Sequence, residues 1–259
     1  MKYKKIICNN KDIFLTMDDF FKKLPAQYGY NYYKNFSDLG MKYVSNLGNG
    51  CTGLYDPDIN YMWYSTNESI PHELFHMAAN DFDKGKLGFY TGKVSAIDEG
   101  IAEYLANRIF NLANSKYYPF ESLCASMLLD YPGVLKAYFQ ANNDELYKQF
   151  NDDDTLEALI EEMNYYNRVS GYLMNMIYMD GENARFDEKA LIDIKGTAYG
   201  IICYLIRLGQ ENKDKINMNK YLAKLMNGFS NSDISNFFNK FYPEYIDDTK
   251  EEIRKLMRW

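Results

Sequence analysis

Hydrophobic residues repeat at helical spacing directly after Pro71. Leu74, Met77 and Ala78 fall at positions i, i+3 and i+4, which form one stripe along a helix. Pro71 suits the first turn of this helix, where its missing N–H costs nothing, and the preceding residue, Ile70, is expected to be extended. The pattern therefore predicts a helix that begins at Pro71 and packs one face into a core.

A second helix is predicted to begin near Ser95. Asp98 and Glu99 fall in its first turn, where the helix dipole favours negative charge. Its apolar face is expected to comprise Ile97, Ile101, Tyr104, Leu105 and Ile109. The intervening stretch from Asn80 to Lys93 contains three glycines and is predicted to be a loop.

The residues before Pro71 mix strand and helix signals. They predict a short strand over Tyr3–Cys8, a helix over Thr16–Leu24 that is capped by Thr16, and a helix over Tyr32–Leu47. Two β-prone runs, Cys51–Tyr55 and Asn60–Ser65, flank a turn-forming Asp-Pro-Asp segment and predict a hairpin.

The chain after about residue 114 is predicted to be mostly helical. Helix starts are expected at Asp154–Thr155, at Ser232 and at Thr249. The predicted fold class is therefore α+β. Residues 1–113 would form a mixed α/β lobe that carries the helices at Pro71 and Ser95, and residues 114–259 a helical lobe. One continuous catalytic domain is the alternative division.

The composition of the chain argues against several classes of partner. The 259-residue chain has a formal net charge of −7 and no basic cluster, which argues against nucleic acid or an anionic membrane as partner. Neither a membrane-spanning apolar run nor the apolar stretch of a signal peptide is evident, so a cytoplasmic location is expected. The four scattered cysteines are expected to be free thiols: Cys8, Cys51, Cys124 and Cys203.

Both histidines of the chain fall in one motif, His72-Glu73-Leu-Phe-His76. Residues four apart on a helix lie one turn above each other, so both imidazoles point toward one place. Two imidazole nitrogens at this spacing suit Zn²⁺, and Glu73 would lie beside the metal, where it can take a proton from water. The motif predicts a zinc site with Glu73 as general base.

A catalytic zinc site needs a third protein ligand, and no histidine remains to supply it. Glu99 and Glu103 lie four residues apart on the next predicted helix and so share one face. One of them is expected to bind zinc, and the other to accept a hydrogen bond from a zinc-binding imidazole.

The combination of His72-Glu73-x-x-His76 with Asp98-Glu99-Gly-x-Ala-Glu103 resembles the gluzincin zinc peptidases, which include thermolysin-like and aminopeptidase-like enzymes. The resemblance covers about forty residues, from Asn67 to Asn107. It implies that Glu99 is the third ligand and that Glu103 supports a histidine. The Gly-x-Met-Glu-Asn signature of the aminopeptidases is absent.

A second alignment is possible. Glu103-Tyr-Leu-Ala-Asn107 is similar to the Glu-x-x-Ala-Asn phrase of the repressor-cleaving ImmA/IrrE peptidases, and it would make Glu103 the third ligand. The Leu-Leu-Met-Pro phrase that follows in that family is missing from this chain. The choice of Glu99 is preferred.

The sequence therefore predicts a zinc metallopeptidase that acts on a peptide or protein. A zinc-binding scaffold without activity and a zinc hydrolase of non-peptide bonds are the alternatives. Asn60–Ser65 is either the edge strand on which gluzincins bind extended peptide or part of the core. A further donor is expected to stabilise the tetrahedral oxyanion, with Tyr90, Tyr172 and Tyr199 as candidates.

Overall fold

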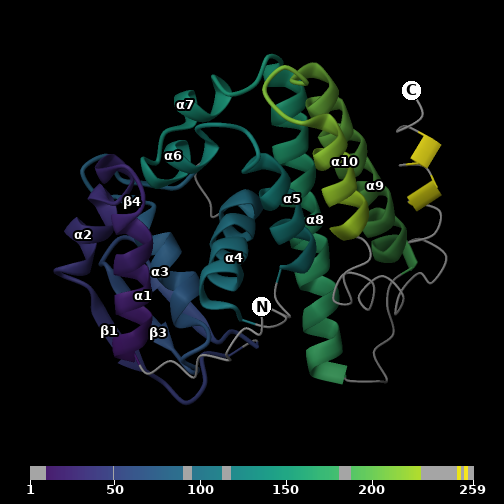
Figure 1. The fold of residues 1–259 in the computed structure, drawn as a ribbon. Coiled ribbons are helices and arrows are strands. Elements are labelled where there is room, and N and C mark those ends of the chain that lie inside the picture. The colour runs from purple at the N-terminus through teal and green to yellow at the C-terminus, as the bar shows by residue number, and fades with distance from the viewer. Residues whose placement is uncertain are drawn as a thin grey trace.

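The computed structural model describes residues 10–48, 50–89, 95–112, 118–180, 188–228, 250–251 and 254–255 (Figure 1). The predicted strand over Tyr3–Cys8, the helix starts at Ser232 and Thr249, and Tyr90 lie outside these residues. The elements of the N-terminal half are α1 (Asn10–Lys22), the 3₁₀ helix η1 (Ala26–Tyr28), α2 (Tyr30–Phe36), β1 (Gly40–Tyr43), β2 (Gly53–Asp56), β3 (Tyr61–Tyr64), α3 (Ile70–Ala78), β4 (Asn80–Asp81) and β5 (Lys86–Leu87).

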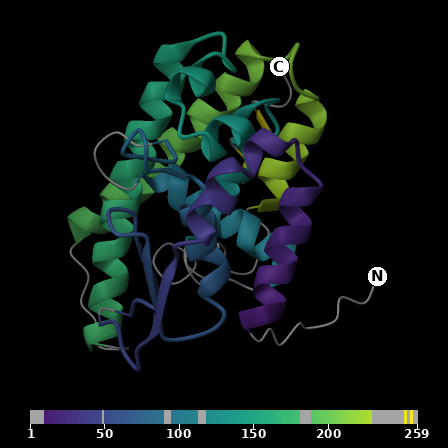
Figure 2. The same ribbon diagram turned by 90° about the vertical axis from the view of Figure 1, so that its left-hand side faces the viewer.

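The described part of the chain after β5 is helical. It comprises α4 (Ala96–Phe110), α5 (Pro119–Leu128), α6 (Val134–Phe139), α7 (Asn143–Tyr147), α8 (Asp153–Asp180), α9 (Glu188–Glu211) and α10 (Met218–Gly228). Figure 2 looks onto the N-terminal side of the molecule, with α1 and the small sheet in front of the C-terminal helices. The α+β class predicted from the sequence is confirmed.

The three-stranded sheet has the order β1–β3–β2. β2 and β3 pair antiparallel, so the predicted hairpin is confirmed, and β1 pairs parallel with the other side of β3. The predicted helix over Tyr32–Leu47 is therefore wrong in its second half. Its residues Gly40–Tyr43 form a strand because β3 supplies a hydrogen-bonding partner that lies about twenty residues further along the chain.

Two helix starts also differ from the prediction. α1 begins at Asn10 rather than Thr16, because Ile13, Met17 and Phe21 form a buried stripe that extends the helix toward the N-terminus. Thr16 is no cap, since its hydroxyl donates within the helix to the carbonyl oxygen of Asp12 at 2.8 Å. Ile70 is helical rather than extended, because α3 begins one residue before its proline.

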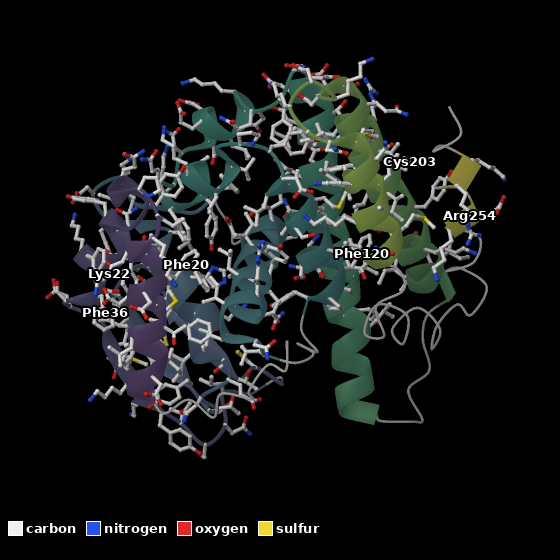
Figure 3. All side chains as sticks on the ribbon, in the orientation of Figure 1. Phe20, Lys22, Phe36, Phe120, Cys203 and Arg254 are labelled. Atoms are coloured by element: carbon white, nitrogen blue, oxygen red, sulfur yellow. The ribbon has the colours of Figure 1, made fainter. Side chains whose placement is uncertain are left out.

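One hydrophobic core runs from α1 to α10. Figure 3 shows Phe20 on the side of α1 that faces the interior, where its ring meets that of Phe75 edge to face at 5.7 Å. On the C-terminal side, Phe120 of α5 packs against Tyr166 of α8. The expected division at residue 113 falls beside residues outside the described ranges and stays a prediction.

The long helices α8 and α9 are the ones that most resemble membrane spans in length. Neither they nor any other helix in the described ranges combines that length with enough apolar character to cross a bilayer.

Candidate metal centre

The motif histidines lie on a helix that has almost no exposed surface. Eight of the nine residues of α3 are buried, including Glu73 and His76. α3 packs against α2, β2 and α4, and lies to the left of α4 in Figure 1. At its N-terminus, the Ser69 hydroxyl donates to the Thr52 carbonyl oxygen at 2.8 Å and so ties the helix to the residue before β2.

The buried C-terminal end of α3 receives its hydrogen bonds from α2. The side-chain amide of Asn35 donates to the carbonyl oxygens of Met77 at 2.8 Å and Asn80 at 2.7 Å. Carbonyl groups in the last turn of a helix have no partner within it, so a buried end needs donors of this kind. Asn35 therefore fixes the end of the helix that carries both histidines.

α4 begins at Ala96 with Ser95 as its N-cap, so the predicted start near Ser95 is confirmed. The Ser95 hydroxyl oxygen accepts a hydrogen bond from the Asp98 backbone N–H and donates one to the Asp98 carboxylate at 2.7 Å. The other carboxylate oxygen of Asp98 accepts the N–H of Phe89 at 2.9 Å. This cap sets the rotation of the helix and so decides that Glu99 and Glu103 face α3.

A close helix contact lies directly beside Glu99. A Cβ atom on Gly100 would stand 2.3 Å from the backbone carbonyl oxygen of Glu121 in α5, which is closer than atoms can approach. Only glycine allows α4 and α5 to pack at this distance. The glycine after Glu99 therefore has a packing role, which the sequence alone did not indicate.

Three side chains converge between α3 and α4. Nε2 of His72 lies 3.0 Å from Nε2 of His76 and 3.1 Å from Oε2 of Glu99, and His76 Nε2 lies 3.6 Å from the same oxygen. Ligands about 2.1 Å from a tetrahedral ion stand about 3.4 Å from one another. The three atoms thus have the spacing of metal ligands, and this group can hold a metal ion.

Glu103 contacts the opposite nitrogen of His72. Its Oε2 lies 2.8 Å from His72 Nδ1, and its Oε1 accepts a hydrogen bond from the Asn107 amide at 3.1 Å. A carboxylate at Nδ1 keeps a proton there and leaves the Nε2 lone pair directed at the ligand group. The Nδ1 of His76 is buried and has no hydrogen-bond partner among the described residues.

Charges within the group strongly perturb its acids and bases. Burial alone would lower the pKa of His72, but its hydrogen bonds to Glu103 and Glu99 raise it well above the ordinary value. Burial opposes ionisation of Glu99 too, yet the two histidines hold its pKa well below the usual range. Without a metal, a proton on His72 supplies the positive charge that these carboxylates attract.

A further acid lies close by. Burial, together with the charges of Glu99 and Glu103, raises the pKa of Glu121, at the start of α5, to about 7. The sequence analysis did not single out Glu121, because only the close packing of α4 and α5 brings it to the site.

Glu73 faces the edge of the sheet. A Cβ atom on Gly53 would lie 2.7 Å from Oε1 of Glu73, so the first residue of β2 lies against this carboxylate. Burial raises the pKa of Glu73, while a hydrogen bond from the Tyr55 backbone lowers it.

β2 is an edge strand, whereas β3 is paired on both sides. The interpretation of Asn60–Ser65 as the edge strand beside the site is therefore wrong, because β1 covers its second side.

A tyrosine that the sequence analysis did not consider lies against the ligand group. The Tyr118 ring stacks on the His72 ring at 6.0 Å, and the charge of Glu99, followed by burial, raises the pKa of its hydroxyl. Tyr118 has a φ of 51°, a left-handed conformation that costs energy in a non-glycine residue, and strained residues of this kind cluster at active sites.

The tyrosines proposed from the sequence lie elsewhere or outside the described ranges. Tyr172 of α8 is 53% exposed and lines a surface cavity with Arg168 and Asp193. Tyr199 of α9 is 41% exposed. Within the described residues, Cys51, Cys124 and Cys203 form no disulfide, and Cys8 is outside those residues.

Comparison with known proteins identifies no relative of this chain. Protein-family models, curated proteins and solved structures were all searched, and none of them matches this chain.

Proposed function

We propose that the protein is a zinc metallopeptidase in which His72, His76 and Glu99 bind the metal. The mutual spacing of their three ligand atoms, 3.0 to 3.6 Å, is the observation that carries this proposal. Two imidazoles and one carboxylate are a ligand set of catalytic zinc sites, in which a fourth position stays open for water or substrate. Glu103 supports the site through Nδ1 of His72, so Glu99 is favoured over Glu103 as ligand.

His72, His76 and Glu99 would hold the zinc, which would lower the pKa of a bound water and polarise a substrate carbonyl. Glu73 accepts the proton of the attacking water and then delivers it to the amide nitrogen that leaves. Its burial suits this role, because a raised pKa lets the carboxylate hold a proton between the two steps. Among the described residues, Tyr118, whose ring stacks on that of His72, is our candidate for donating a hydrogen bond to the oxygen that becomes negative.

The substrate is proposed to be a polypeptide in extended form. Ser65 N–H donates to the Thr52 carbonyl, and hydrogen-bonded pairs alternate along an antiparallel ladder. The main-chain groups of Gly53 and Tyr55 therefore point away from β3, where the Tyr55 N–H donates to Glu73 and the Gly53 carbonyl oxygen accepts a hydrogen bond from the Cys51 thiol. An extended peptide that lies along this edge would have its main chain beside the general base.

The test is hydrolysis of a quenched-fluorescent peptide library by the zinc-loaded protein. We expect cleavage that a chelator abolishes and added zinc restores. Glu73→Gln should bind the same amount of zinc and lose at least about a hundredfold in kcat, because it removes the proton acceptor and leaves the ligands. Full activity of this variant, or no cleavage of any library member by the wild type, would refute the proposal.

A further inference from the structure

Two neighbouring main-chain groups on the outer edge of β2 are already hydrogen-bonded to side chains of the chain itself. The N–H of Tyr55 donates to the carboxylate of Glu73. The carbonyl oxygen of Gly53 accepts a hydrogen bond from the thiol of Cys51, whose sulfur lies 2.7 Å away. These two groups flank Leu54 on the side of β2 that does not pair with β3, so they are a donor and an acceptor that a further strand would need.

Both contacts compete directly with an incoming polypeptide. A peptide nitrogen that donates to a carbonyl lies about 2.9 Å from its oxygen, and the sulfur of Cys51 is as close as that to the oxygen of Gly53. Oε1 of Glu73 also lies against the strand, since a Cβ atom on Gly53 would stand 2.7 Å from it. Main-chain pairing along this edge therefore requires both side chains to move.

The two side chains differ in where they can move. Cys51 is exposed, so its thiol can turn from Gly53 into solvent. Glu73 is only 7% exposed, and a buried carboxylate leaves one donor only when another takes its place. The attacking water of the proposed mechanism is such a donor, because Glu73 accepts its proton.

We propose that these two contacts are autoinhibitory, and that they keep the edge of β2 closed to polypeptide until Glu73 turns to the attacking water and Cys51 turns into solvent. This inference rests on the proposed function, because it concerns the edge along which the substrate is proposed to lie. A substrate must then displace two side chains before its main chain can pair with β2. The same contacts protect the edge from other strands while the site is idle.

The test measures binding rather than cleavage, by fluorescence polarisation of a short fluorescein-labelled peptide of alternating valine and serine residues. In the metal-free protein, Cys51→Ala and Glu73→Ala should each raise the affinity about three- to tenfold, because each frees one main-chain group of β2. The double variant should combine the two gains. Cys51→Ser is the matched control, since its hydroxyl keeps a donor at Gly53 and should leave the affinity within about twofold of the wild type.

The binding measurement separates this inference from the proposed function, and circular dichroism checks that each variant folds. A gain in affinity in both alanine variants, with no cleavage of any peptide by the zinc-loaded wild type, would retain the closed edge and refute the peptidase. Cleavage by the wild type with an unchanged affinity in either alanine variant would overturn the closed edge alone. The absence of both cleavage and any gain in affinity would refute the two together.

Discussion

Oε2 of Glu103 lies 2.8 Å from Nδ1 of His72, on the side of the imidazole opposite Glu99. Asn107, one turn further along α4, donates a hydrogen bond to Glu103. The imidazole thus lies between two carboxylates of one helix, since its Nε2 is 3.1 Å from Glu99. The two glutamates contact opposite nitrogens, and substitution of each should therefore have a different effect on metal binding.

Glu99→Ala is expected to lose bound zinc, because it removes a ligand and leaves two. Glu103→Ala should keep about one zinc per chain but bind it about 10- to 100-fold more weakly, because His72 loses the group that orients it. Elemental analysis and competition with a chelator measure the two effects, and circular dichroism checks that both variants fold. Full zinc content in Glu99→Ala would transfer the ligand role to Glu103 and favour the alignment with the repressor-cleaving peptidases.

Zinc affinity should depend on pH through His72. The raised pKa of this imidazole in the metal-free protein means that zinc must displace a proton at every pH below that value. Affinity is therefore strongest at high pH and weakens as the pH falls, by up to about tenfold per unit for one displaced proton. Competition with a chromophoric chelator from about pH 5.5 to about pH 8.5 measures the slope.

Glu103→Gln gives the matching control for this slope. The substitution removes one of the two carboxylates that raise the pKa of His72, so the region in which affinity depends on pH should move to lower pH. An affinity that is independent of pH in the wild type would contradict the prediction.

Gly100→Ala should destabilise the protein and weaken zinc binding. The added Cβ would stand 2.3 Å from the Glu121 carbonyl oxygen, so α4 and α5 must separate, at a cost of about 1–3 kcal/mol in unfolding free energy. Gly196→Ala is the control on α9, where a Cβ meets no atom within 4 Å and helix propensity should add up to about 1 kcal/mol. Urea denaturation measures both, and opposite signs are expected.

Asn35→Ala should lower the free energy of unfolding by about 2–4 kcal/mol. It removes the donor to the Met77 and Asn80 carbonyls at the buried end of α3. Its neighbour Lys34 forms only an exposed ion pair with Asp83, so Lys34→Ala should change stability by less than about 1 kcal/mol. Equal thermal midpoints for the two variants would show that Asn35 does not hold the helix end.

Local signals predicted the elements that carry the site. Pro71 and Ser95 mark the starts of two helices. The spacing of His72 from His76, and of Glu99 from Glu103, is set within those helices once they form. Both the proline and the cap act within one helical turn of the residues they organise. This part of the site was therefore visible in the sequence.

Features that depend on distant partners were not visible. β1 became a strand through β3, and that pairing also determined that β2, not β3, is the edge at Glu73. Tyr118 is one of 25 tyrosines, and only its backbone conformation and the packing of α5 bring its ring onto His72. No periodicity in the chain encodes contacts of this kind.

A helix buried on all sides couples the chemistry of this protein to its folding. α3 has almost no solvent-facing surface from which it could loosen by itself, so the amide protons of Glu73 to His76 should exchange with solvent only when the whole core opens. Core substitutions that lower global stability will then also raise the rate at which bound metal escapes. Selection for a functional site and selection for a stable core would act on the same residues.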